Sequence, residues 1–196
     1  MADARLVVDY GADALGLVFY DRSPRNVSIE QAHEIVASLP AFVSSVALFV
    51  DADPKFIDNV LQHVNIDVIQ FHGGESAQGC GRYGKRYIKA VSMRDDVDLM
   101  ATSKQYMQAS ALLVDSYRPG IPGGTGEVFD WERIPPNLDK PVILAGGLDT
   151  DNIQRAIRTV QPYAVDVSSG VERDKGIKDE GKIESFMQGV YSVKSK

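Results

Sequence analysis

Short apolar segments recur along this chain, each about as long as a single β-strand. Within each segment the apolar residues are continuous rather than alternating with polar ones, which indicates strands buried on both faces. Stretches with helical periodicity separate these segments, and such an order is typical of a parallel sheet covered by helices. The segments are 14–19, 45–50, 68–71, 87–91, 111–114, 141–145 and 164–167.

The stretches between these predicted strands carry signals for helix starts. Ser28 is a good N-cap for a helix over 28–39, and Pro54 suits the first position of a helix over 53–64. Gly11 ends a helix predicted over 3–8, which precedes the first strand. Further helices are predicted over 75–83, 94–107, 150–160 and 179–193.

The ends of the predicted strands separate two fold classes, the doubly wound sheet and the (β/α)8 barrel. Nearly every strand ends in polar residues or glycine, for example Val114-Asp115 and Gly146-Gly147. In a barrel these ends meet at one rim, where the active site lies. A Rossmann-type nucleotide site would need a GxGxxG motif, which the sequence lacks. We therefore predict one α/β domain over residues 1–196, a TIM (β/α)8-type barrel with seven visible strands that lacks the first.

Composition and charge exclude several kinds of partner. The net charge is −6 and there is no basic run, which argues against a nucleic-acid surface. No apolar run approaches the ~20 residues needed to cross a bilayer, and the first residues do not form a signal peptide. The one cysteine, Cys80, fits a reducing compartment, so we predict a cytoplasmic protein without nucleic-acid or membrane partners.

Three glycine-containing segments that follow predicted strands are candidates for holding an anion. Glycine allows positive φ and close backbone approach, so that successive N–H groups can point at one phosphate. In barrels the loops after the seventh and eighth strands often form such a site. Tight βα turns, or a flexible loop in the case of 119–131, are the structural alternative. The candidate residues are Gly124, Gly126, Gly146, Gly147, Ser169 and Gly170.

Five segments in order and at matching spacing resemble the phosphoribosylanthranilate isomerase family of tryptophan biosynthesis. They read GADALGLVFYDRSPRNVS, VIQFHGGES, GGTGEVFDW, PVILAGGLDTDNI and PYAVDVSSGVE followed by GIKD. The resemblance extends from about Asp3 to Val190. It implies an isomerase that converts N-(5-phosphoribosyl)anthranilate to 1-(2-carboxyphenylamino)-1-deoxyribulose 5-phosphate by an Amadori rearrangement. It also implies a small phosphorylated substrate and no cofactor or metal.

The resemblance implies roles for individual residues. Asp115 matches the general acid that protonates the furanose oxygen, the alternative being an Asx turn that caps its loop. Arg25 matches the arginine that binds the anthranilate carboxylate, and Asp166 and His72 match substrate-binding positions at the rim. Gly146, Gly147, Ser169 and Gly170 match the phosphate-binding positions of the family, and the loop with Gly124 and Gly126 is expected over the same rim.

The family begins with a strand whose cysteine acts as the general base, and this sequence has no such stretch before its first predicted helix. From this we predict an open barrel, impaired turnover, and a homodimer through the exposed strand edges. Cys80 lies in the predicted helix 75–83, on the outer ring, so it does not replace that base. A truncated sequence, a variant that has lost activity and a rearranged assembly remain open as explanations.

Two other functions remain open at this stage. One is a non-catalytic barrel remnant that binds phosphate esters or acts as an interaction protein. The other is a related barrel lyase such as indole-glycerol-phosphate synthase, which needs a lysine acid at the rim. Lys89 lies near a strand end, but the remaining motifs favour the isomerase.

Overall fold

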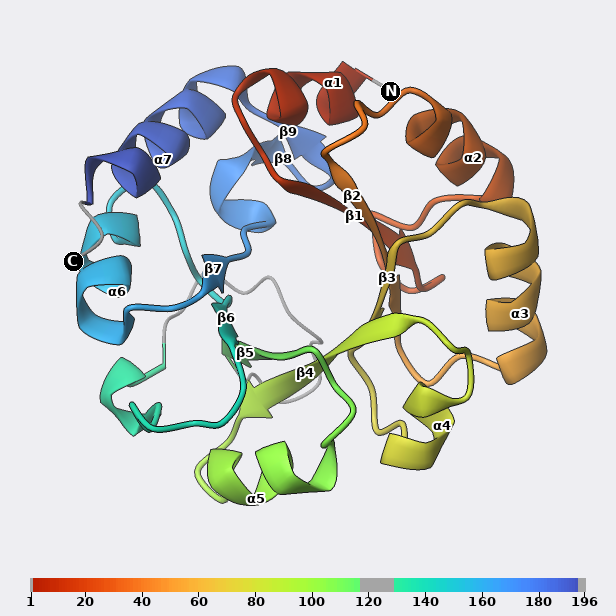
Figure 1. Ribbon diagram of the computed structural model, residues 1–196. Helices are drawn as coiled ribbons and strands as arrows, with labels where there is room; N and C mark the ends of the chain where they lie inside the picture. The colour runs from red at the N-terminus through yellow and green to blue at the C-terminus, as the bar shows by residue number, and fades with distance from the viewer. Residues whose placement is uncertain (1, 117–128, 194–196) are drawn as a thin grey trace. The chain divides into compact units, whose positions relative to one another are not determined.

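Parallel strands joined by helices account for most of the chain in a computed structural model, which describes residues 2–116 and 129–193 (Figure 1). The chain divides into two compact units, Met1–Lys89 and Ala90–Lys196, here called the first and the second unit. The glycines predicted to bind phosphate at positions 124 and 126 lie outside the described residues.

The first unit holds four neighbouring parallel strands in chain order. They are β1 (Ala14–Phe19), β2 (Ser44–Phe49), β3 (Val68–Phe71) and the first part of β4 (Arg86–Met93). The helices that precede or connect them are α1 (Ala2–Asp9), α2 (Ile29–Ala37), α3 (Pro54–His63) and α4 (Ala77–Gly81).

The second unit begins with the rest of β4 and continues the same alternation. Its parallel strands are β5 (Ala111–Ser116), β6 (Val142–Leu144) and β7 (Ala164–Val165), paired in chain order. Its helices are α5 (Leu99–Gln105), η1 (Trp131–Arg133), α6 (Ile153–Val160), η2 (Ser169–Val171) and α7 (Glu180–Ser192). A short antiparallel hairpin, β8 (Glu172–Asp174) and β9 (Ile177–Lys178), lies between η2 and α7.

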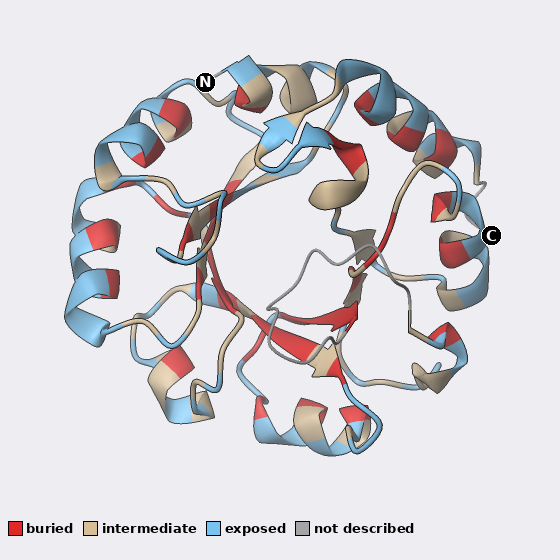
Figure 2. Ribbon diagram, turned by 180° about the vertical axis from the view of Figure 1, so that it is seen from behind, coloured by how far each residue is buried: buried red, intermediate tan, exposed pale blue. Residues whose placement is uncertain are grey.

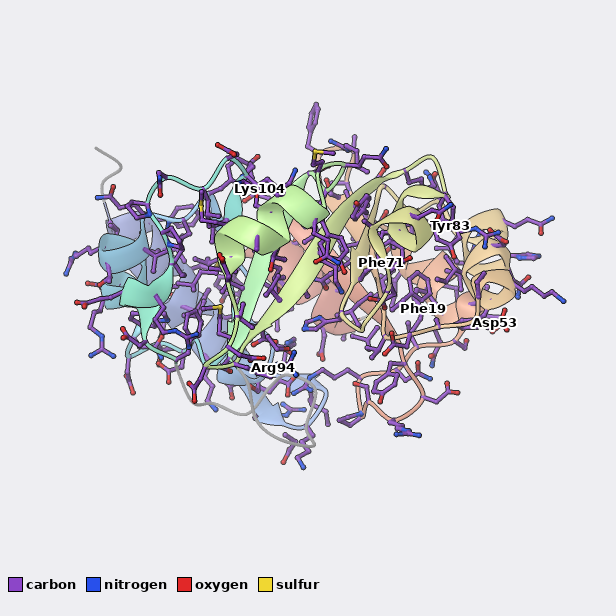
Figure 3. The ribbon with its side chains drawn as sticks, turned by 90° about the horizontal axis from the view of Figure 1, so that it is seen from below. Phe19, Asp53, Phe71, Tyr83, Arg94 and Lys104 are labelled. Atoms are coloured by element: carbon purple, nitrogen blue, oxygen red, sulfur yellow. The ribbon has the colours of Figure 1, made fainter. Side chains whose placement is uncertain are left out.

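Burial explains why these segments form strands and helices. All six residues of β5 are buried, as expected for a strand covered on both faces. The helices instead bury residues on one side and expose the other, as Figure 2 shows. In the first unit, Phe19, Phe49 and Phe71 occupy matching register positions on β1, β2 and β3, with Phe19 and Phe71 labelled in Figure 3. The rings of Phe19 and Phe49 stack at 5.4 Å, and Phe56 of α3 packs edge-on against both.

The seven predicted strands are confirmed, with ends that differ by up to two residues. The start signals are confirmed as well: Ser28 forms a capping box with Gln31, and Asp53 caps α3 ahead of Pro54. The predicted helix over 94–107 is too long. The carboxylate of Asp98 accepts hydrogen bonds from the backbone N–H groups of Met100 and Ala101. Asp98 is therefore the N-cap, and α5 begins only at Leu99. No helix within the described ranges has the length and apolar character needed to cross a bilayer.

Candidate active site

The end of β5 places the predicted acid against the turn that follows β6. Asp115 and Ser116 are only 5% and 6% exposed. Gly146 has φ +78°, and a Cβ added to it would overlap Ser116 N and lie 2.5 Å from Asp115 Oδ1. Only glycine therefore lets the turn approach the carboxyl group this closely.

Ser116 is a further candidate site residue that the sequence reasoning missed. Its hydroxyl is buried and has no hydrogen-bond partner within the described part of the chain. A Cβ at Gly146 would lie 2.7 Å from this hydroxyl, so Ser116 Oγ and Asp115 Oδ1 face the same glycine. A buried hydroxyl without a partner is costly, and such groups gather at functional sites. Its place directly after Asp115 in the sequence is the signal that could have found it.

The turn after β6 is held by side chains at the start of α6. Gly146 and Gly147 both have positive φ, +78° and +67°. Asn152 Nδ2 donates to Gly147 O at 2.8 Å, and Asp149 Oδ1 accepts from the N–H groups of Asp151 and Asn152, both at 2.9 Å. The glycine pair therefore has a fixed backbone conformation in this structure.

The turn after β7 packs directly on the turn after β6. A Cβ at Gly170 would overlap Leu148 O and lie 3.0 Å from Asp149 Cα. Gly170 belongs to η2, whose first residue is Ser169 and whose N-terminus receives no side-chain cap. The contacts of Gly146 with Asp115 and of Gly170 with the turn after β6 thus bring together five predicted site residues of the second unit: Asp115, Gly146, Gly147, Ser169 and Gly170.

Asp166, the sixth predicted residue of this unit that the structure describes, follows β7. Its N–H donates to Leu144 O at 2.9 Å, which continues the pairing of β7 with β6 beyond the strand end. The residue is exposed. Asp166 therefore lies at the same strand end as the turn that holds Ser169 and Gly170, and its role stays a prediction.

In the first unit, Arg25 lies in a loop that folds back on β1. Val27 N donates to Val18 O at 3.0 Å, and Tyr20 N donates to Asn26 Oδ1 at 2.9 Å. Arg25 N itself donates to Ser23 Oγ at 3.2 Å, and the residue is half-buried. The loop that carries this arginine is therefore held against the strand.

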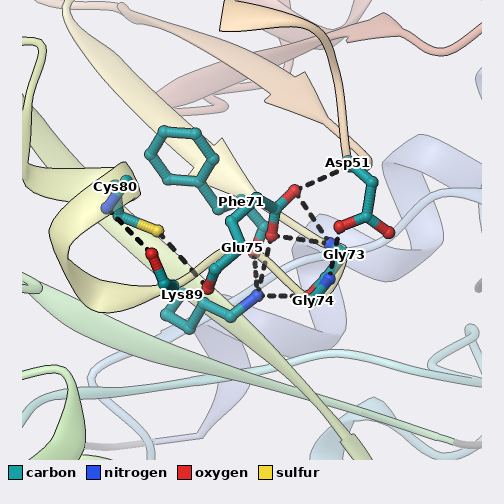
Figure 4. A network of polar contacts seen from close by, with 9 residues as sticks. Asp51, Phe71, Gly73, Gly74, Glu75, Cys80 and Lys89 are labelled. Carbon is teal, nitrogen blue, oxygen red and sulfur yellow. Dashed lines mark hydrogen bonds and ion pairs between the residues drawn. The ribbon is translucent and has the colours of Figure 1, made fainter.

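His72 follows β3, and Lys89 lies on the neighbouring strand β4. His72 N donates to Phe49 O at 2.8 Å, and the side chain is half-buried. Lys89 is 4% exposed and its Nζ donates to Phe71 O, Gly73 O and Glu75 Oε2 (Figure 4). An ammonium group has three protons, so all of them are used within the protein. Lys89 therefore does not fit the lysine acid that the lyase alternative requires.

Cys80 is a buried residue of α4, as predicted for a small core side chain. It is 1% exposed, and its Sγ lies 3.9 Å from Glu75 O. Desolvation by burial raises the pKa of its thiol to about 11. A thiol that stays protonated at neutral pH and lies inside the helix layer does not fit the general base. Within the described residues no group of His, Cys, Asp or Glu could hold a metal ion.

Comparison with known proteins decides the family. The family model described as N-(5'phosphoribosyl)anthranilate (PRA) isomerase matches residues 1–189. The chain belongs to this family. It is 56% identical over 191 residues to N-(5'-phosphoribosyl)anthranilate isomerase of Nitrosococcus oceani, covering 97% of this chain and 93% of that protein. The enzyme of the same name from Pseudomonas fluorescens is 53% identical over 188 residues, covering 96% and 90%.

Solved structures of the family confirm the fold class. Phosphoribosyl anthranilate isomerase from Thermotoga maritima superimposes with a TM-score of 0.88 at 38% identity, over 97% of this chain and 93% of that one. A structure of phosphoribosyl anthranilate isomerase in complex with reduced 1-(o-carboxyphenylamino)-1-deoxyribulose 5-phosphate gives a TM-score of 0.81 at 35% identity, over 97% and 93%. The chain has the α/β, TIM-barrel type fold of an isomerase of tryptophan biosynthesis.

Two predictions that rested on the missing first strand are not supported. The matches cover almost all of this chain and 93% of the Nitrosococcus oceani enzyme, which gives no support to a truncated barrel. Nor do the comparisons give any sign of impaired turnover. The sequence pattern showed only that no cysteine-bearing strand precedes the first helix, and that observation does not by itself establish a loss of activity.

Proposed function

We propose that this chain catalyses the Amadori rearrangement of N-(5-phosphoribosyl)anthranilate with Asp115 as the general acid. The observation that carries the proposal is the contact between the buried Asp115 carboxyl group and the glycine turn at Gly146 and Gly147. This turn in turn contacts the one at Gly170. A proton donor and two turns suited to an anion are therefore joined at the carboxyl ends of neighbouring strands, where barrel enzymes hold their substrates.

The glycine turns bind the phosphate group of the substrate in this proposal. Gly146 and Gly147 hold positive φ, and Ser169 and Gly170 open η2 without a side-chain cap. Backbone N–H groups in such turns hold a phosphate without a lysine or arginine side chain. Gly124 and Gly126 are proposed to complete this binding site.

Asp115 supplies the proton that opens the sugar ring. As the bond between the anomeric carbon and the ring oxygen breaks, the proton goes to that oxygen and the lone pair of the anthranilate nitrogen forms a C=N bond. A base then takes the proton from the neighbouring carbon, a role assigned to none of the described residues, which gives an enolamine. Protonation of the carbon next to nitrogen and loss of the enol hydroxyl proton convert the enolamine to the aminoketose. The 5% exposure of Asp115 keeps bulk water away from this transfer.

Arg25 binds the anthranilate carboxylate in this proposal, because a guanidinium group matches a planar carboxylate with two parallel hydrogen bonds. In this proposal His72, which follows β3, and Asp166, which follows β7, contact the sugar. We also propose that residues 1–196 form one domain and that the protein is cytoplasmic. One solved relative from Thermotoga maritima is described as dimeric, and a homodimer through strand edges is proposed for this chain as well.

Turnover by the purified 196-residue chain tests the proposal. We expect formation of the aminoketose without an added metal or cofactor. Arg25→Ala should raise KM by about 10- to 100-fold through loss of a charge-assisted contact. Arg22→Ala, which removes an exposed arginine from the same loop, is the matched control and should leave KM unchanged. Binding of reduced 1-(o-carboxyphenylamino)-1-deoxyribulose 5-phosphate without any turnover would instead favour the non-catalytic binding protein.

A further inference from the structure

Lys89 is a charged residue in a position that otherwise belongs to the core. On β4 it pairs in register with Phe71 of β3, and it is 4% exposed. Paired residues of neighbouring parallel strands face the same side of the sheet, so Lys89 shares the side on which Phe71 contacts Tyr83 and Tyr87. Burying an ammonium group is costly, and an ion pair in the core is often replaceable by apolar side chains without loss of stability. Packing alone therefore does not explain Lys89.

The acceptors of Lys89 lie in and beside the turn that follows β3. Its Nζ donates to Phe71 O at 3.2 Å, to Gly73 O at 2.5 Å and to Glu75 Oε2 at 3.0 Å, as Figure 4 shows. Phe71 and Gly73 are the two chain neighbours of His72. The lysine thus fixes the backbone on both sides of the histidine.

Glu75 joins the same turn to the end of β2. Its Oε1 accepts from Asp51 N at 2.9 Å, and its Oε2 accepts from Gly73 N at 3.0 Å (Figure 4). Asp51 Oδ1 in turn accepts from Gly74 N at 2.7 Å. Asp51 has φ +48°, a conformation that costs about 1–2 kcal/mol in a residue other than glycine. Such backbone strain persists where the surrounding contacts determine the conformation, and it concentrates near functional sites.

The turn after β3 also packs closely against Asp51. A Cβ at Gly73 would lie 2.5 Å from Asp51 Cγ, so the backbone at Gly73 rests directly on that carboxylate. His72 N is anchored to Phe49 O at 2.8 Å. The turn is held from β2, from β4 and by its own Glu75 side chain.

We propose that Lys89 and Glu75 are positioning residues that hold His72 in place for substrate binding. The inference rests on the proposed function, in which His72 contacts the sugar. The buried ion pair contributes the geometry of the 72–75 turn rather than proton transfer, because Lys89 Nζ donates to this turn and to the strand end before it.

Steady-state kinetics with a double-mutant cycle tests this proposal. Lys89→Met should raise KM by about 10- to 100-fold, since a displacement of about 1 Å in a binding group has effects of this size. His72→Asn should raise KM similarly, and Lys89→Met should add little in the His72→Asn background. Lys85→Met is the matched control. Lys85 immediately precedes β4, and its Nζ donates to Ile66 O at the end of the strands opposite to His72. The KM of this variant should equal that of the wild type.

A second variant and a spectroscopic measurement separate positioning from folding. Lys89→Met combined with Glu75→Gln removes both charges, so that no unpaired carboxylate is left buried if Lys89→Met alone fails to fold. The NMR resonance of His72 Cε1–H should shift in this double variant and stay in place in Lys85→Met. An unchanged KM and an unchanged His72 resonance in a variant with reduced thermal stability would overturn the proposal, as would an unaltered KM in His72→Asn. Failure of the proposed function looks different, because the wild-type chain would then show no turnover whatever the His72 resonance does.

Discussion

The first unit has a polar cluster at each end of its strands, and the two clusters differ in what they fix. At the amino ends, Ser45 of β2 is 1% exposed and its Oγ lies 2.7 Å from Asp67 Oδ2. Ser45 N donates to the same carboxylate oxygen at 2.8 Å. At the carboxyl ends, Lys89 and Glu75 hold the turn around His72, and Asp51 adopts a strained conformation.

The difference indicates that the amino ends of the strands contribute to stability and the carboxyl ends to catalysis. At the amino ends, both the backbone N–H and the hydroxyl of Ser45 donate hydrogen bonds to the Asp67 carboxylate, and neither residue has positive φ. The carboxyl ends instead combine positive-φ residues, close glycine contacts and buried charged groups. We expect substitutions at the amino ends to change stability with little effect on catalysis, and substitutions at the carboxyl ends to change catalysis.

Among substitutions at the carboxyl ends of strands, Gly146→Ala in the second unit should have the largest effect on catalysis. The new Cβ would overlap Ser116 N and meet Asp115 Oδ1 at 2.5 Å, so the carboxyl group and the turn must move apart. We expect kcat to fall by at least about 100-fold, because the proton donor loses its alignment. Steady-state kinetics measures the loss.

Gly84→Ala is the matched control for this glycine. Gly84 also has positive φ, +63°, but a Cβ there would meet nothing within 4 Å. This variant should lose about 1–2 kcal/mol of stability from strain and keep its kcat. Equal losses of kcat in the two variants would show that general destabilisation, rather than the contact with Asp115, explains the result at Gly146.

Ser45→Ala should give the largest effect at the amino ends. It removes the hydroxyl contacts to Asp67 Oδ2 and to Asn65 O, the latter at 2.9 Å, from a fully buried position. Urea unfolding should show a loss of about 1–3 kcal/mol, with kcat and KM unchanged. Ser38→Ala, at an exposed helix end, should change stability by less than about 0.5 kcal/mol. A change in KM for Ser45→Ala would break the proposed division between the two strand ends.

Acid unfolding should report a smaller contribution from Asp67. Hydrogen bonds from the backbone and hydroxyl of Ser45 hold the pKa of this carboxyl group below its ordinary value. A lowered pKa in the folded state stabilises the protein above the unfolded pKa and is lost as pH falls through the folded one. Asp67→Asn should therefore lower stability at neutral pH and flatten the loss of stability below about pH 4. A variant with an unchanged acid profile would contradict this.

Cys80→Ala should have the smallest effect on catalysis. The raised thiol pKa, about 11, and its burial predict that Cys80 takes no part in proton transfer. We expect kcat within about twofold of wild type, against a loss of about 100-fold or more on removal of a general base. A thiol-specific reagent at pH 8 should modify the folded protein far more slowly than the urea-unfolded chain. Loss of turnover in Cys80→Ala would make this cysteine the base.

The strands were predictable because each is buried on both faces, which leaves an unbroken apolar run such as residues 111–114. The helix boundaries were less predictable where a side chain binds the backbone N–H groups just before the helix. Asp149 binds the N–H groups of Asp151 and Asn152, so α6 begins at Ile153 rather than near residue 150. The β8–β9 hairpin is short and largely polar. Its sequence therefore has no alternation of apolar and polar residues from which strands could be predicted.

Candidate site residues were recognised where a motif includes them, as at Asp115 and Gly146. The contact between these two residues was not predictable, because it depends on the register of β5 with β6 and on a glycine conformation. Lys89 was judged from its place near a strand end alone. Its role becomes visible only when the turn after β3 is placed beside it.

The most direct test of the account is a paired measurement of kcat and of unfolding free energy in Asp115→Asn. The amide keeps the shape of the side chain but has no acidic proton to give, so we predict a loss in kcat of about 10²- to 10⁴-fold with unfolding free energy equal to wild type or higher. Ser45→Ala measured beside it should show the reverse pattern. Turnover of Asp115→Asn within tenfold of wild type would contradict the assignment of Asp115 as the proton donor.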